Sequence, residues 1–79
     1  MTSAELSRIL GNRIRKLREE KNISQQNLAE MCNFEKSNMA RIEAGRTNPT
    51  LFSMYKISSA LKITLSELVF FDSKSSDVV

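Results

Sequence analysis

The sequence predicts an all-α fold, a compact domain of five helices, and three observations support this prediction. The 79-residue chain holds only two glycines and one proline, and runs of β-branched residues are few, a composition that favours helix over sheet. Apolar residues recur at intervals of three and four, the spacing of one helix face. Residues that cap helices separate these runs. A chain of this length forms one domain with a modest core, which we place at residues 1–71.

A capping box opens the first predicted helix. Thr2 can accept a hydrogen bond from the amide of Glu5, and the Glu5 carboxylate can accept one from the amide of Thr2. The helix continues to about Lys21, where Asn22 can adopt the left-handed conformation that ends it. The apolar residues at helical spacing are Leu6, Ile9, Leu10, Ile14 and Leu17.

Two shorter helices follow. Ser24 caps the second helix, and Asn33 and Phe34 form the turn that leads to the third. The third helix stops at Gly45. The inward residues of the two helices are expected to be Leu28, Ala29, Cys32, Met39 and Ile42.

A loop and two further helices complete the predicted domain. The loop covers residues 46–49, because the only proline pushes the residue before it out of helical geometry. Thr50 caps the fourth helix, and residues 64–67 form a second capping box that opens a short fifth helix through about Phe71. The tail, residues 72–79, shows no periodicity and is predicted to be disordered. The inward residues of the fourth helix are expected to be Leu51, Met54, Ile57, Ala60 and Leu61.

The composition argues against several classes of chemistry. There is no histidine, and Cys32 is the only cysteine, so neither an intrachain disulfide nor a Ser–His or Cys–His catalytic unit can form. Carboxylates with one thiolate are a poor set of zinc ligands. We therefore expect no cofactor, no metal and no enzymatic activity, with a lysine- or carboxylate-based enzyme as the remaining alternative. No apolar stretch reaches the roughly 20 residues of a membrane span, and no signal peptide is evident, so the expected location is the cytoplasm.

The positive charge is concentrated in the first part of the chain. Residues 1–46 contain nine Lys or Arg and six Asp or Glu, whereas residues 47–79 contain three of each. Such a distribution is typical of a region that faces a polyanion. A solvated basic face would account for the charge equally well.

The segment most informative about function is residues 25–46, QQNLAEMCNFEKSNMARIEAGR. Two short helices joined by a turn of about three or four residues form a helix-turn-helix, whose second helix enters the major groove of DNA. Two helices that cross so closely require a small residue at the crossing, and Ala29 supplies it. We place the motif at residues 25–45 and expect double-stranded DNA as the partner.

Four stretches of this chain together resemble the lambda-repressor-like, or Cro/C1-type, family, which includes phage repressors, Cro proteins and the controller proteins of restriction–modification systems. The stretches are IRKLREEKNISQQNLAE, RIEAGR, NPTL and ALKITLSELV, and the resemblance covers roughly residues 8 to 70. It implies a five-helix DNA-binding domain and a transcriptional regulator. Asn22, Asn33 and Lys62 stand where this family usually has glycine. Asn tolerates a positive φ at modest cost and Lys tolerates it less well.

The exposed face of the third helix is expected to read base edges. Lys36 and Arg41 can donate to guanine, Ser37 can serve several bases, and Glu35 can accept from cytosine. Ala40 projects from the same face. The alternative is that Lys36 and Arg41 only contact phosphate.

Phosphate contacts are expected around this face. Gln25 opens the second helix, where the first amides meet an anion favourably. The further phosphate-contacting residues are expected to be Asn38, Arg46, Thr47, Asn48 and Arg15.

Arg18 and Glu43 occupy positions where similar repressors hold an ion pair between helices. A planar guanidinium can bind a carboxylate through two hydrogen bonds and so fix the third helix against the first. An exposed pair of little energetic consequence is the alternative.

The fifth helix is unusually apolar for its length. So short a helix cannot bury all its apolar residues, and some are expected to contact a second chain and form a homodimer on an inverted-repeat operator. A fully internal cap on the core is the alternative. Phe52 and Tyr55 would join that interface or lie over the DNA backbone. The candidate interface residues are Leu65, Leu68, Val69, Phe70 and Phe71.

The expected function is a sequence-specific regulator of the controller or repressor type. No segment that could sense a small-molecule effector is apparent, so protein concentration and dimerisation would provide the control. One alternative is an antitoxin-type protein that binds a toxin and its own operator. Another is a non-specific nucleic-acid-binding factor.

Overall fold

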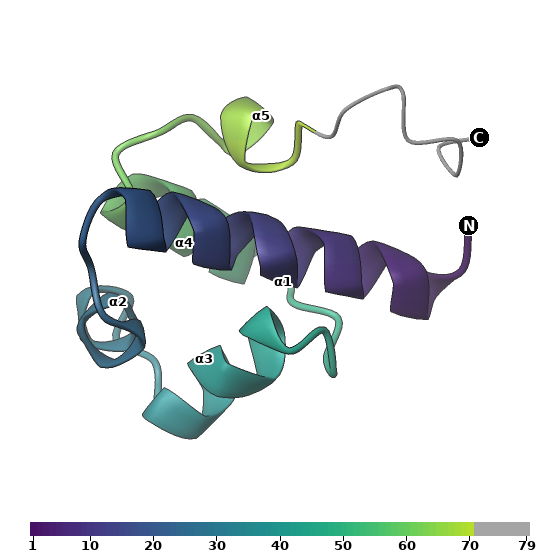
Figure 1. Ribbon diagram of the computed structural model, residues 1–79, viewed down its shortest axis with the longest axis horizontal. Helices are drawn as coiled ribbons and strands as arrows, with labels where there is room; N and C mark the ends of the chain where they lie inside the picture. The colour runs from purple at the N-terminus through teal and green to yellow at the C-terminus, as the bar shows by residue number, and fades with distance from the viewer. Residues whose placement is uncertain (71–79) are drawn as a thin grey trace.

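Five α-helices build the part of the chain that the computed structural model describes, residues 1–70, and no strand occurs there. The predicted all-α class is confirmed. Figure 1 shows α1 as a long spine, with α2 and α3 on one side of it, α5 on the other, and α4 behind it in this view. Phe71 and the predicted disordered tail, residues 72–79, lie outside the described residues. The helices are α1 (Ser3–Glu20), α2 (Gln25–Met31), α3 (Lys36–Glu43), α4 (Leu51–Ala60) and α5 (Leu65–Leu68).

The helix starts are those that the sequence predicts. The side chains of Ser24 and Thr50 accept from the amide three residues on, and both capping boxes form, at Thr2 with Glu5 and at Thr64 with Glu67. Hydrogen bonds from the backbone amides of the two threonines lower the pKa of Glu5 and of Glu67. These local contacts satisfy amides that have no partner within the helix.

Four helices end in the same hydrogen-bonded motif. At the end of α1, the amide of Asn22 donates to the Glu19 carbonyl and that of Ile23 to the Arg18 carbonyl, which is the pattern of a Schellman motif. The ends of α2, α3 and α4 repeat this pattern. The central residues, all with positive φ, are Asn22 (58°), Asn33 (58°), Gly45 (74°) and Lys62 (60°).

All five helices contribute buried residues to one core. Burial raises the pKa of the Cys32 thiol, so this cysteine behaves as a small apolar core residue. The ten buried hydrophobic residues are Leu10, Ile14, Leu28, Ala29, Cys32, Met39, Ile42, Ile57, Leu61 and Leu68.

Two expectations about α4 and α5 are wrong. Leu51 is 67% exposed, because at about 100° per residue it lies roughly 120° around the helix from the buried Ile57. The fifth helix ends at Leu68 rather than near Phe71. Nη2 of Arg13 donates to the Glu67 carbonyl in this short helix at 2.7 Å.

Candidate nucleic-acid interface

The helix-turn-helix consists of α2, the turn at residues 32–35 and α3. Leu28 and Ala29 are buried on the inner face of α2, and Met39 and Ile42 are buried on that of α3. The half-buried Phe34 packs against the same core. The two helices therefore share one apolar contact, which leaves the opposite face of α3 outside the core.

That outer face of α3 presents most of the residues expected to read bases. The side chains of Lys36, Ser37 and Arg41 are exposed, and Ala40 is half-buried between them. Glu35 stands at the N-cap without a side-chain capping hydrogen bond, so its carboxylate is available to an external donor. Hydrogen-bonding groups of this kind on one helix match the donor and acceptor pattern of a major groove.

An ion pair between Arg18 of α1 and Glu43 of α3 fixes the inner face of α3. Nε of Arg18 lies 2.7 Å from Oε2 of Glu43, and Nη2 lies 3.0 Å from Oε1. The side chains are only 11% and 3% exposed. The hydrogen bonds to Glu43 raise the pKa of Arg18, so the guanidinium group stays charged at physiological pH. Its two parallel hydrogen bonds fix the orientation of α3 as well as its distance from α1.

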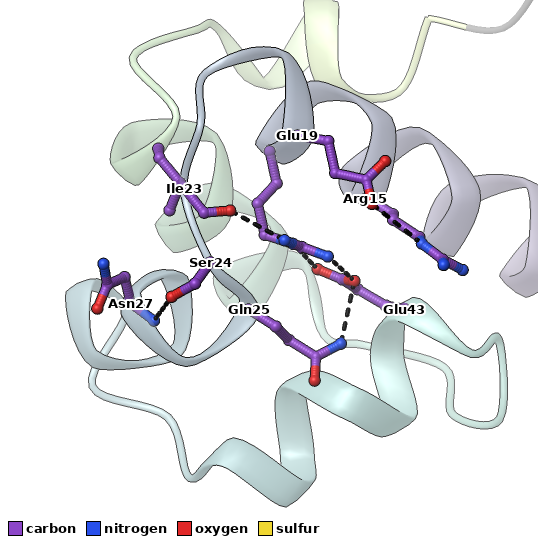
Figure 2. Close-up of polar contacts among 8 residues, drawn as sticks. Arg15, Glu19, Ile23, Ser24, Gln25, Asn27 and Glu43 are labelled. Atoms are coloured by element: carbon purple, nitrogen blue, oxygen red, sulfur yellow. Dashed lines mark hydrogen bonds and ion pairs between the residues drawn. The ribbon is translucent and has the colours of Figure 1, made fainter.

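Two further hydrogen bonds extend this pair to the start of α2, as Figure 2 shows. Nη1 of Arg18 donates to the Ile23 carbonyl at 2.9 Å. Nε2 of Gln25 donates to Oε1 of Glu43 at 3.1 Å. The network therefore joins α1, the start of α2 and the end of α3. Gln25 was predicted to contact phosphate, and its contact with Glu43 was not predicted, since no local pattern pairs residues 18 apart.

A close approach of α1 to α3 supports the same arrangement. A Cβ atom at Gly11 would lie 2.5 Å from the Glu43 carbonyl oxygen and 2.6 Å from that of Ile42. Only glycine fits where backbones come so close. This contact was not predicted from the sequence. The signal was a glycine in the middle of a strong helical pattern, where it destabilises unless a neighbour requires it.

The residues expected to contact phosphate lie around the outer face of α3. Arg46 and Asn48 are exposed in the loop after α3, and Thr47 and Asn38 are half-buried. Arg15, on α1, is exposed and lies 3.5 Å from Glu19 in a surface ion pair. Gln25 is at the first position of α2, beside amides that have no partner within that helix.

The apolar residues at the end of the described chain divide into two groups. Leu68 is fully buried and the half-buried Leu65 packs against the core, so Leu68 takes no part in the surface that a second chain could meet. Val69 is 39% exposed and Phe70 is 67% exposed. Phe71, the remaining candidate, lies outside the described residues.

Phe52, one of the exposed aromatic residues of α4, is connected to the helix-turn-helix through Lys56. Nζ of Lys56 lies 5.1 Å from the centre of the Phe34 ring and 5.4 Å from that of the Phe52 ring, within cation–π range. Lys56 therefore links α4 to the turn before α3. Tyr55 is exposed nearby on the same helix.

Residues 14–68 match the HTH_3 family of helix-turn-helix proteins, and the chain belongs to this family. It is a DNA-binding transcriptional regulator and resembles controller and repressor proteins. The family is one of regulators and not of enzymes. Within residues 1–70, no helix has the length and apolar character that crossing a membrane would require.

Three relatives illustrate the resemblance. The control protein C.MunI of a Mycoplasma species is 42% identical over 59 residues, which are 73% of this chain and 80% of the relative. The restriction–modification controller protein C.AhdI of Aeromonas hydrophila has a solved structure with a TM-score of 0.77 and 34% identity, covering 78% of this chain and 94% of that one. The immunity repressor protein of Bacillus phage phi105 is 38% identical over 60 residues, 76% of this chain and 42% of the relative.

Proposed function

We propose that this regulator binds an inverted-repeat operator as a homodimer and reads it with the outer face of α3. The observation that carries the proposal is the division of α3 into two faces. Met39, Ile42 and Glu43 are buried against α1 and α2, whereas Lys36, Ser37 and Arg41 are exposed. Because the inner face is fixed by the bidentate pair with Arg18, the outer side chains approach DNA from a preorganised backbone.

The proposed roles follow from the positions of the side chains. Glu35, Lys36, Ser37, Ala40 and Arg41 contact base edges. The backbone phosphates are contacted by Gln25 at the start of α2, by Asn38 of α3 and by Arg15 of α1. The loop after α3 contributes Arg46, Thr47 and Asn48.

Dimerisation is proposed because one recognition helix reads too few base pairs to define a unique site. A two-fold dimer places two such helices on one face of the duplex, about 34 Å apart. Val69 and Phe70 supply exposed apolar surface at the end of α5, and residues of this kind occupy the centre of such interfaces. With no effector required, protein concentration controls the dimer and so the operator. Such a regulator acts in the cytoplasm, with the DNA that it binds.

Selection of bound sites from a random duplex library tests the proposal. We expect an inverted repeat, and a specific affinity about a thousandfold or more above that for a scrambled duplex. Lys36→Ala should change the preferred base at one position in each half-site, whereas Arg46→Ala should weaken all duplexes alike. Equal affinity for selected and scrambled duplexes would rule out specific recognition.

Sedimentation tests the dimer separately. Phe70→Glu should make the protein monomeric at tens of micromolar, and Phe52→Glu, on α4, is the matched variant. If only Phe52→Glu dissociates the dimer, the interface lies on α4 instead. A parent protein that is monomeric and binds DNA without concentration dependence would refute dimerisation.

A further inference from the structure

The arginines of α1 fall into two groups with different surroundings. Arg13 and Arg18 are used within the fold, by the Glu67 carbonyl and the Glu43 carboxylate. Arg8 and Arg15 are exposed. Arg8 makes no hydrogen bond or ion pair within residues 1–70, and Arg15 has only the exposed pair with Glu19. Because such exposed pairs contribute little, both guanidinium groups are available to an external anion.

The two exposed arginines share one face of α1 with Asn12. Arg8, Asn12 and Arg15 stand at relative positions 0, 4 and 7, so at 3.6 residues per turn they fall within about 60° around the helix. All three are exposed. They form a row along α1 that carries two positive charges and one amide; we refer to it as the α1 row.

The α1 row runs beside the recognition helix. Arg15 lines a cavity of about 260 Å³ together with Gln25, Ala40 and Ala44, which places it next to the end of α3 and the start of α2. Arg8 lies at the other end, where a Cβ on Gly45 would be 2.7 Å from its Cα and Cγ atoms. Arg8 therefore adjoins the loop that contains Arg46.

We propose that Arg8, at one end of the α1 row, binds a backbone phosphate and extends the DNA contacts along α1. The inference rests on the proposed DNA-binding function and adds a contact from α1 beyond the expected set. A polyanion fits this surface because Arg8 lies against Gly45, the neighbour of the exposed Arg46, and neither arginine forms an ion pair within residues 1–70. The contact is with phosphate, so it strengthens binding to every sequence equally.

The salt dependence of binding tests this contact directly. For the duplex chosen by site selection, we expect Arg8→Gln to reduce the slope of log K against log salt by about 0.9, the contribution of one neutralised phosphate. The preferred sequence should not change. Glutamine keeps the Cγ atom that packs on Gly45, so the melting temperature should stay that of the parent.

Lys16→Gln is the matched control. Lys16 is also exposed on α1, but about 140° around the helix from Gly11, which faces α3. This variant removes the same charge and should keep the parental slope. Arg8→Lys retains the positive charge and should also keep the parental slope. A loss of slope in Arg8→Gln is then due to the lost charge and not to a folding defect.

The outcomes separate the two proposals. A parent that shows no preference for any duplex refutes the proposed function itself. A parent that binds specifically, with Arg8→Gln unchanged in slope, overturns the phosphate contact alone. A changed base preference in Arg8→Gln, or an equal loss of slope in Lys16→Gln, also overturns it.

Discussion

The end of α3 differs from the ends of α1, α2 and α4, although all four close with the same hydrogen bonds. In each motif the central residue adopts positive φ, between 58° and 74°. That residue is Asn22, Asn33 or Lys62 in three of them, and only α3 has a glycine, Gly45. The three non-glycine residues show that the left-handed conformation by itself does not require glycine in this fold.

The neighbour of Gly45 explains its identity. A Cβ there would meet backbone atoms of Arg8 at 2.7 Å and 3.0 Å. Glycine is therefore required by the packing of α1 on the loop, and not by the backbone conformation alone.

The next residue in each motif shows a second difference. Ile23, Phe34 and Ile63 are half-buried and pack against the core, which is the hydrophobic contact that often accompanies a Schellman motif. The corresponding residue after α3 is Arg46, which is exposed. Three helix ends thus stabilise the fold, and the fourth leaves its side chain for the proposed DNA contact.

The largest effect is expected from Gly45→Ala. A left-handed alanine costs about 1–2 kcal/mol, and overpacking against backbone adds about 1–3 kcal/mol, so we expect the free energy of unfolding to fall by about 4 kcal/mol. Urea denaturation measures the loss. Asn33→Ala is the control, since it has the same sign of φ without the collision with Arg8. Equal losses for the two variants would show that the contact with Arg8 has no energetic weight.

Arg18→Ala should be nearly as damaging. It removes the partner of the buried Glu43 and the donor to the Ile23 carbonyl at the end of α1, and an unpaired buried carboxylate costs about 3 kcal/mol. Thermal and urea unfolding report the change. Arg15→Ala removes an exposed arginine from the same helix and should have little effect on stability. An Arg18→Ala protein that melts like the parent would show that water solvates Glu43 adequately.

Ile63→Ala and Arg46→Ala compare the two kinds of helix end. The half-buried Ile63 packs on the core, and its truncation should cost about 2 kcal/mol, the lower end of the range for fully buried isoleucine. Arg46→Ala should change stability by less than about 0.5 kcal/mol but weaken DNA binding. If Arg46→Ala destabilised the fold as much as Ile63→Ala, the distinction between the two ends would fail.

Lys62→Gly is expected to stabilise the protein. The substitution removes the strain of a left-handed lysine, which is worth about 1–2 kcal/mol. Glycine also raises the backbone entropy of the unfolded chain, which reduces this stabilisation by about 0.5–1 kcal/mol. The net increase should be close to 1 kcal/mol in urea denaturation. Asn22→Gly should gain less, because asparagine tolerates positive φ. A loss of stability in Lys62→Gly would mean that the lysine side chain makes a compensating contact.

The smallest effect is expected at the starts of α1 and α5. There an ionised carboxylate accepts a hydrogen bond, whereas the Schellman motifs at the helix ends use only backbone hydrogen bonds. Glu5 and Glu67 have pKa values below the ordinary 4.5 because threonine amides donate to them. A carboxyl group with a lowered folded pKa stabilises the fold above its unfolded pKa and loses that contribution as pH falls through the folded value. The amide resonances of Thr2 and Thr64 should therefore titrate below pH 4.5 in NMR spectra. A midpoint at or above 4.5 would mean that the capping boxes are not formed in solution.

Much of the fold could be predicted because its signals are local. The capping residues at Thr2, Ser24, Thr50 and Thr64 act within one helical turn, so they are readable from adjacent positions. The positive φ at Asn22, Asn33 and Lys62 was expected from the glycines that similar repressors have there. The predictions were wrong at Leu51, which lies outside the inward face of α4, and at the end of α5, which stops at Leu68.

The sequence by itself determined where the helices start, where α1, α2 and α3 stop, most of the apolar faces, and which residues of α3 differ chemically from its core side. These properties follow from spacing and from hydrogen bonds a few residues apart. Only the tertiary structure decided that Gln25 joins the Arg18–Glu43 pair, that Leu68 is internal, that Gly11 and Gly45 admit the backbones of other segments, and that Arg8 adjoins the loop after α3. Each of these depends on a distance between residues far apart in the chain, and helix periodicity carries no information about the crossing of two helices.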